Sequence, residues 1–259
     1  MTKLLFIFLA VIGIWLTSFT SVNLKTNKIR NVVIDPGHGG KDPGCVGKNC
    51  MEKDVAMAIA YGFGANIRAH MKDVNVIYTR TRDEFIELRE RARLANKEHS
   101  DLFISIHANA ATTPDMFGTE TYVMGLNSAD ENLDVAKREN ASILKESGYQ
   151  EHYKGFDPND AASHILMLNY QNTYHKSSTI MANHIENHFK NKLLRHSRGV
   201  KQANFLVLQQ VSMASVLVEV GFLTNSTEES FLNGSKGQAH ISYELYKAFR
   251  DYKTEFEKY

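Results

Sequence analysis

Short apolar segments alternate with amphipathic helical segments along most of this sequence, and this alternation restricts its fold more than any other feature. Apolar runs predict strands at 31–34, 74–78, 102–106, 119–124, 205–208 and 215–220. Helical spacing predicts helices from 52 through at least 67 and at 83–97, 179–194 and about 235–256. Strands that alternate with helices predict one α/β domain over residues 29–257, with most of its sheet covered on both faces.

The first residues have the pattern of a secretory signal peptide, which we assign to 1–22. Lys3 supplies a positive charge, residues 4–16 form an unbroken apolar run, and residues 17–21 are mostly small and polar. The run is shorter than the roughly 17 to 25 residues that span a bilayer, so we expect cleavage, with an uncleaved anchor as the alternative. The sequence therefore predicts an exported protein of the periplasm or cell envelope.

Export would permit a disulfide between the two cysteines of the chain. Cys45 and Cys50 lie close together in a glycine-containing loop, and two free thiols are the alternative.

The overall charge does not indicate a nucleic-acid partner. Thirty basic residues stand against twenty-nine acidic ones, so the net charge is close to zero. Such a chain has no broad electrostatic attraction to nucleic acid or to an anionic membrane. We expect a monomer whose partner is selected by a local site.

Three polar side chains occur where predicted strands end. His38 follows the first strand, His107 ends the strand at 102–106, and Glu219 lies near the end of the strand at 215–220. Because ligands bind at the carboxyl ends of strands in open α/β sheets, these side chains can converge, and Glu52 at the start of a helix can join them. Two imidazoles and one carboxylate would hold Zn²⁺ and leave a fourth position for water. Glu219 would then take the water's proton and pass it to a departing nitrogen.

Each of these residues also has a simpler interpretation. A histidine is more often a surface or core residue than a metal ligand. An ionised Glu219 within a run of valines is costly unless it is paired or used, but strand alternation on an edge strand would point it to solvent. No two histidines have the short spacing of a HExxH helix, so spacing alone does not establish a metal site.

Several motifs in order resemble the zinc-dependent N-acetylmuramoyl-L-alanine amidases of bacteria, over nearly the whole chain after residue 30. These motifs are 33–44 (VIDPGHGGKDPG), 52–54 (EKD), 79–80 (TR), 89–96, 105–110 (SIHANA) and 218–225 (VEVGFLTN). The resemblance implies one catalytic zinc ion held by His38, Glu52 and His107, with Glu219 as the catalytic glutamate. It implies that the substrate is the peptidoglycan amide between the lactyl group of N-acetylmuramic acid and L-alanine.

The resemblance also implies the details of the fold. We expect a twisted, mostly parallel or mixed sheet of about six strands with helices on both faces, as in phosphorylase/hydrolase-like folds.

A polar stretch at about 127–176 interrupts the alternation. In family members that separate daughter cells, an insertion at this place carries a helix that covers the zinc until an activator protein draws it away. The resemblance therefore implies a regulatory insertion here, with a helix within 128–146. Glu139 is the first candidate to block the zinc, followed by Glu131 and Asp134; the alternative is an exposed helix with solvated charges.

Two other functions fit parts of the sequence. An exported zinc peptidase would use the same metal chemistry on peptides without sugar. A non-catalytic cell-wall binding module would need neither zinc nor the four acidic and imidazole side chains.

Overall fold

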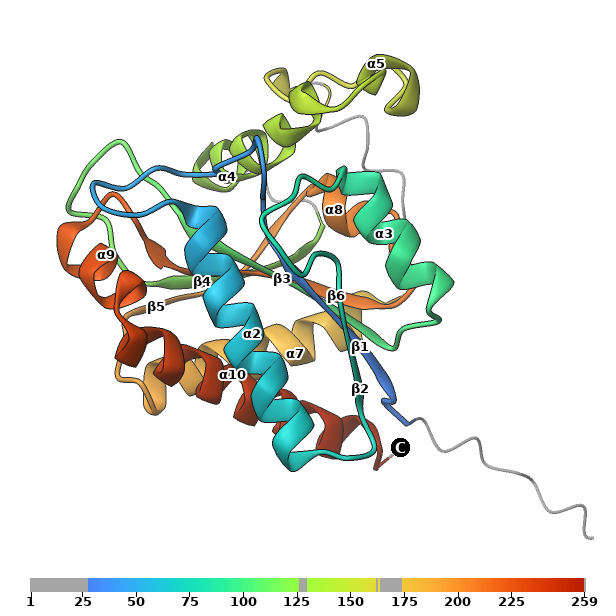
Figure 1. The fold of residues 1–259 in the computed structure, drawn as a ribbon, viewed down its shortest axis with the longest axis vertical. Helices are drawn as coiled ribbons and strands as arrows, with labels where there is room; N and C mark the ends of the chain where they lie inside the picture. Colours follow the sequence, from blue (N-terminus) through green and yellow to red (C-terminus); the bar gives the residue numbers. More distant parts are fainter. Residues whose placement is uncertain (1–27, 126–129, 162, 164–173, 259) are drawn as a thin grey trace, which may run out of the picture.

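A six-stranded mixed sheet forms the centre of the computed structural model, which describes residues 28–125, 130–161, 163 and 174–258 (Figure 1). The predicted leader, 1–22, lies outside the described residues. The strands are β1 (Asn31–Pro36), β2 (Asn75–Tyr78), β3 (Leu102–Asn109), β4 (Thr119–Met124), β5 (Ser197–Ala203) and β6 (Ala214–Phe222). Their order is β2-β1-β3-β6-β4-β5. The first four strands of this order are parallel, whereas β4 pairs antiparallel with β6 and parallel with β5. The expected α/β fold is confirmed.

Helices cover both faces of this sheet. The longer ones are α2 (Glu52–His70), α3 (Leu88–Lys97), α4 (Asp130–Asn140), α7 (His175–Asn191) and α10 (Ser235–Phe256). Shorter ones are η1 (Ala141–Lys145), α5 (Tyr149–His152), α8 (Leu206–Gln209) and α9 (Ser226–Asn233). The helices α2, α7 and α10 pack on one face, and α3, α4, η1 and α8 pack on the other.

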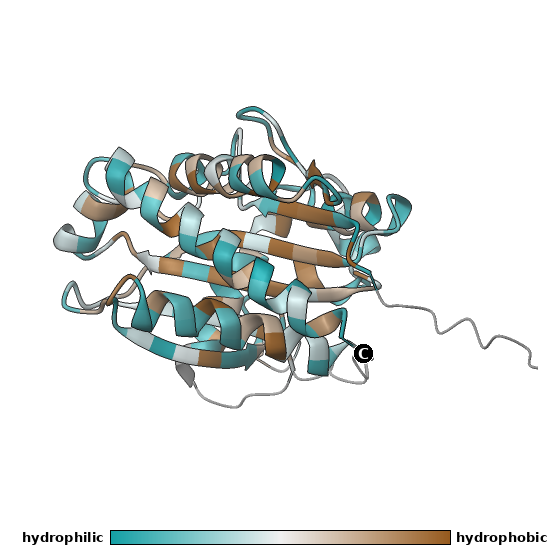
Figure 2. Cartoon of the chain, turned by 90° about the horizontal axis from the view of Figure 1, so that it is seen from below, coloured by the Kyte–Doolittle hydropathy of each residue, from teal (hydrophilic) through white to brown (hydrophobic). Residues whose placement is uncertain are grey.

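Alternation along the central strands produces these two cores. In β1, Val32 and Ile34 pack with the α2 side, while Val33 between them packs with the α3 side. Figure 2 shows the apolar residues gathered on the strands and on the inner sides of the helices. Strands buried on both faces are continuous apolar runs, which is why β1, β3 and β6 were recognisable in the sequence.

One predicted strand is wrong, and one strand was missed. Residues 205–208 do not form a strand; α8 begins at Leu206, because four buried apolar residues can also form a helical turn against a core. The true strand β5 lies just before it, at the edge of the sheet, and most of its residues are half-buried and polar. None of the helices in the described part of the chain is long and apolar enough to span a membrane.

Candidate functional site

Two arginines hold the loop after β1, which carries His38. Arg80 donates to the carbonyl oxygens of Pro36, at 3.0 Å, and of Gly37, at 2.8 Å. Arg91 donates to the carbonyl oxygen of His38 itself at 2.8 Å. The backbone φ of His38 is 58°, in the left-handed region that residues other than glycine rarely adopt. These contacts support the unusual turn from which the His38 side chain enters the site.

Glu52 is the first residue of α2, and backbone groups fix both of its carboxylate oxygens. Oε2 accepts from the N–H of Cys45 at 2.7 Å, and Oε1 accepts from the N–H of Ala108 at 3.0 Å. The loop must pass close by: a Cβ on Gly44 would lie 2.5 Å from both Glu52 Oε2 and His38 Cδ2. A glycine is therefore required where the loop crosses these two side chains.

His107 and Glu219 lie side by side at the carboxyl ends of β3 and β6. The two residues are paired in the parallel register of these strands, so their side chains share one face of the sheet. That face is the one covered by α3 and α4, because Phe103 and Leu217, which precede them by an even number of residues, pack there.

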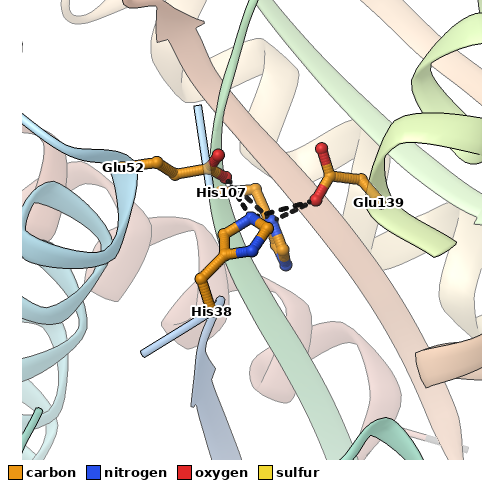
Figure 3. Close-up of side chains that lie close together, drawn as sticks. All are labelled: His38, Glu52, His107 and Glu139. Atoms are coloured by element: carbon orange, nitrogen blue, oxygen red, sulfur yellow. Dashed lines mark hydrogen bonds and ion pairs between the residues drawn. The ribbon is translucent and has the colours of Figure 1, made fainter. Parts of the chain in front are cut away.

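Four buried side chains meet at this edge of the sheet (Figure 3). Glu52 Oε1 lies 3.0 Å from His38 Nε2 and 2.9 Å from His107 Nδ1. From the opposite side, Glu139 Oε2 of α4 lies 3.1 Å and 2.9 Å from the same two nitrogens. One ligand atom from each residue lies within 4.8 Å of the others. We call these four residues the metal cluster.

The donors of the metal cluster suit a zinc ion. Tetrahedral zinc with nitrogen and oxygen ligands at 2.0–2.2 Å implies ligand separations of roughly 3.3 Å, and the four nitrogen–oxygen distances given above, 2.9–3.1 Å, are close to this value. Within the described residues, His38 Nε2 and Glu139 Oε2 are buried in ion-pair contacts of 2.9–3.1 Å, but neither atom has a hydrogen bond of suitable geometry. Buried polar atoms without hydrogen bonds are unusual, and a cation at the centre would satisfy both.

The charges of the metal cluster shift one another's pKa values. Burial alone would lower the pKa of the imidazoles, but the neighbouring carboxylates raise the pKa of His38 well above its usual value and that of His107 to about 10. Burial would raise the pKa of the carboxylates, but the imidazoles lower it to about 2 for Glu52 and well below the usual range for Glu139. Without metal the cluster thus holds protons, which a bound cation would displace.

The outward-facing nitrogen of each imidazole meets a buried oxygen. His38 Nδ1 lies 2.9 Å from Asp42 Oδ2, and His107 Nε2 lies 3.1 Å from Ser105 Oγ. Such outer contacts orient metal-binding imidazoles. His38 therefore faces the centre of the cluster with Nε2, and His107 faces it with Nδ1.

Glu219 is fully buried next to the metal cluster, and β6 is an interior strand, so the edge-strand interpretation does not apply. Among the described residues neither carboxylate oxygen has a hydrogen-bond partner. Burial and then the charge of Glu139 raise its pKa well above the usual value. Arg138 Nη2 lies 3.7 Å from Glu219 Oε1. A carboxyl group with a raised pKa beside a metal cluster is suited to proton transfer.

Residues 130–145, which form α4 and η1, lie over the metal cluster; we call them the cover. Besides Glu139, the cover places Arg138 in the site, where Nη2 donates to Asn109 Oδ1 at 2.8 Å and Nη1 donates to the Ala110 carbonyl at 3.1 Å. Asp134 is exposed and does not reach the cluster, and the side chain of Glu131 is outside the described residues.

Polar contacts hold the cover in place. The Asn140 side chain donates to the Asn204 carbonyl and accepts from the Leu206 N–H, both at 2.8 Å. Ser142 Oγ and Lys145 Nζ each lie 2.7 Å from an oxygen of Asp42, the carboxylate that also contacts His38.

Sequence reasoning did not single out Arg138, Asp42 or Ser105 as site residues. Asp42 and Ser105 lie within the recognised motifs, four residues after His38 and two before His107, but Arg138 has no sequence signal other than its place beside Glu139. Cys45 and Cys50 are free thiols in this structure.

A cavity of about 580 Å³ adjoins the site beside Arg138. It lies between the loop after β3, the strands β4 and β5, and α4, and its lining includes Asn109, Thr112, Glu120, Tyr122, Arg138 and Lys201. Its size is typical of small-molecule sites, which occupy about 300–1,000 Å³.

Residues 32–251 match the N-acetylmuramoyl-L-alanine amidase family, Amidase_3. The chain is 36% identical over 209 residues to the N-acetylmuramoyl-L-alanine amidase AmiA of Salmonella typhimurium, covering 80% of this chain and 71% of that protein.

Solved structures give the same result. The N-acetylmuramoyl-L-alanine amidase of Clostridium difficile 630 has a TM-score of 0.64 at 27% identity, covering 87% of this chain and 97% of that one. The amidase AmiC2 of Nostoc punctiforme has a TM-score of 0.60 at 28% identity, covering 86% and 96%.

Proposed function

Since the chain belongs to the N-acetylmuramoyl-L-alanine amidase family and is a peptidoglycan amidase, we propose that its reaction is zinc-dependent and uses the metal cluster together with Glu219. His38, Glu52 and His107 would hold one zinc ion. The bond cut is the amide between N-acetylmuramic acid and L-alanine. The observation that carries this proposal is the convergence of these three donors, with two buried polar atoms of the cluster lacking hydrogen bonds.

Bound zinc would polarise the substrate carbonyl and make water acidic enough to attack near neutral pH. The protein itself positions the metal-binding groups before the substrate binds. Backbone N–H groups hold the Glu52 carboxylate, and Arg91 holds the loop that carries His38. The adjoining cavity beside Arg138 gives room for part of the substrate next to Glu219.

Glu219 would act as general base and then as general acid. Its burial and raised pKa let the carboxylate accept a proton from the attacking water and hold it in a site with little solvent. The same proton then passes to the departing nitrogen of L-alanine. Hydrolysis is complete without a covalent bond between enzyme and substrate.

Metal analysis combined with a digestion of purified peptidoglycan tests this function. We expect one zinc per chain, released peptides with a free amino-terminal alanine, and glycan strands without peptide. Cleavage only between amino acids would instead identify an exported peptidase. Glycan binding without zinc or hydrolysis would identify a wall-binding module.

We also propose that the cover inhibits the enzyme. Glu139 contacts both imidazoles where a substrate or water would have to bind, and Arg138 faces Glu219. Deleting 127–176 should raise basal activity on purified peptidoglycan. A folded deletion protein with unchanged activity contradicts inhibition by this segment.

An activator protein that binds the 127–176 segment would release the cover. Much of the cover's attachment is polar, so water can replace those contacts once it lifts. A protein from the same cell envelope that activates the full chain, but not the deletion variant, would meet this expectation. An activator that works equally on both proteins would act elsewhere.

Export completes the proposal. Cleavage of the leader near residue 22 would deliver the enzyme as a monomer to the periplasm or cell envelope, where its substrate is. Amino-terminal sequencing of the mature protein and its mass in solution test these two points.

A further inference from the structure

We propose that Ser105 and Asp35 are positioning residues that make Nδ1 of His107 the nitrogen that binds the metal. This inference rests on the zinc site proposed above. It concerns three buried side chains that contact one another in series: Asp35 on β1, then Ser105 and His107 on β3.

Strand geometry brings these three groups together. Ser105 and His107 are two residues apart on β3, so their side chains lie on the same face of the sheet. Asp35 is paired with Ser105 in the parallel register of β1 and β3. Ser105 Oγ therefore lies 2.7 Å from Asp35 Oδ2 and 3.1 Å from His107 Nε2.

The position of one hydroxyl proton decides the protonation of the ring. Asp35 is ionised, because Arg91 Nη1 lies 2.8 Å from its Oδ1 in a fully buried ion pair. An ionised carboxylate only accepts, so Ser105 must donate its single hydroxyl proton to Asp35. The Ser105 oxygen then offers only lone pairs to His107, and Nε2 must carry a proton to satisfy both atoms.

A proton on Nε2 leaves Nδ1 free to bind metal. Nδ1 is the nitrogen that faces Glu52 and Glu139 in the metal cluster. Asp35 and Ser105 are both fully buried, so water cannot replace either contact. His38 uses a shorter arrangement, in which Asp42 contacts its Nδ1 directly and leaves Nε2 for the metal.

A structural role alone is the competing explanation, because these contacts also join β1 to β3. Thr79 provides the control. Its hydroxyl donates to the other oxygen of Asp35 at 2.5 Å and is also buried, but it does not contact His107. Loss of either hydroxyl removes one hydrogen bond to the same carboxylate.

Zinc affinity, measured by chelator competition on metal-stripped protein, separates the two explanations. We expect Ser105→Ala to weaken zinc binding by about 10- to 100-fold, the usual effect of removing an outer partner of a metal-binding histidine. Thr79→Val should stay within about threefold of wild type, and Ser105→Thr, which keeps the hydroxyl, should restore most of the affinity. A folded Ser105→Ala protein with wild-type affinity, or an equal loss in Thr79→Val, would overturn the proposal.

Nitrogen NMR of the zinc-loaded wild-type protein gives a second test that needs no variant. The His107 ring should show a protonated Nε2 and a metal-bound Nδ1, and metal on Nε2 would overturn the proposal. Wild-type protein that binds no zinc would contradict the metal site itself. Zinc binding and amidase activity with an unchanged Ser105→Ala affinity would contradict only the role of Ser105.

Discussion

The two sides of the metal cluster are held in different ways. His38, Glu52 and His107 stand on the sheet or on the segments that follow its first strand. Backbone N–H groups fix Glu52, Arg91 holds the backbone of His38, and Ser105 contacts the ring of His107. Glu139 comes instead from the cover. The cover adds a few apolar side chains to the core, and its other contacts include polar bonds from Arg138, Asn140 and Lys145 to the surrounding segments.

This difference leads to separate predictions for the proposed catalytic residues and for the proposed inhibition by the cover. We expect His38, Glu52 and His107 to keep their positions when the cover leaves, because none of the backbone contacts to Glu52 comes from the cover. Water can replace the polar contacts of the cover after release, so their loss costs about 0.5–1.5 kcal/mol each for neutral groups. Changes on the sheet side should therefore abolish activity, and changes in the cover should increase it.

The largest effect is expected on the sheet side. Glu219→Gln keeps the shape of the side chain but removes the proton acceptor, so peptidoglycan hydrolysis should fall by about 10²- to 10⁴-fold while zinc content stays at wild-type level. Glu186→Gln is the matched control, because it removes another buried carboxylate, on α7 and outside the metal cluster, and should keep activity. A Glu219→Gln protein with full activity would rule out this residue as the base.

A smaller effect of opposite sign is expected in the cover. Asn140→Ala removes two buried bonds that form only while the cover is seated, which amounts to about 1–3 kcal/mol. Basal activity should rise by roughly 5- to 150-fold. Among the described residues, the Asn132 side chain of the same helix makes one long contact, 3.4 Å to the Gln202 carbonyl, so Asn132→Ala should change activity much less. Equal activity of both variants and wild type would show that Asn140 does not hold the cover closed.

The smallest expected effect concerns pH. Glu146, just after the cover, accepts from the Leu88 N–H and the Tyr153 hydroxyl, and burial raises its pKa. While the cover is bound to the sheet, the pKa of Glu146 is thus above the value of about 4.3 for a solvated glutamate. Glu146 therefore stabilises the bound cover fully at a pH below about 4.3, and this stabilisation is lost as the pH rises through the raised pKa.

Hydrogen exchange of the α4 amides, corrected for intrinsic rate, measures this effect. Exchange should increase with pH more in wild type than in Glu146→Gln, which keeps an acceptor oxygen but does not titrate. The exposed Glu151→Gln is the control and should behave as wild type. Identical pH profiles for wild type and Glu146→Gln would contradict the role of Glu146.

Prediction from sequence succeeded where both faces of an element are buried. The strands β1, β3 and β6 were visible as apolar runs, and His38, His107 and Glu219 were placed at their ends. The edge strand β5 could not be recognised, because half-exposed polar residues give no apolar alternation. A short apolar run at 205–208 does not distinguish a strand from a helical turn.

Contacts between distant segments were harder to foresee. The resemblance suggested Glu139, but only the fold shows that Arg138 faces Glu219 and that Asp42 contacts both His38 and Lys145. These pairs depend on how the cover packs against the sheet, and spacing along the chain contains no record of that packing. The same holds for Ser105 and Asp35, which meet through the pairing of two strands.

Basal peptidoglycan hydrolysis by zinc-loaded Glu139→Ala tests the contrast between the two sides most directly. Glu139 Oε2 lies 3.1 Å and 2.9 Å from the two imidazole nitrogens that would bind zinc, so its carboxylate would occupy the position that water needs at the metal. Loss of one charged contact of about 1.5–3 kcal/mol corresponds to a rise in activity of roughly tenfold to a hundredfold without an activator. Lys137→Ala removes a charged side chain from the same helix that lines neither the metal cluster nor the adjoining cavity, and should leave the rate unchanged. A Glu139→Ala protein that keeps its zinc but hydrolyses peptidoglycan no faster than wild type would contradict inhibition by the cover.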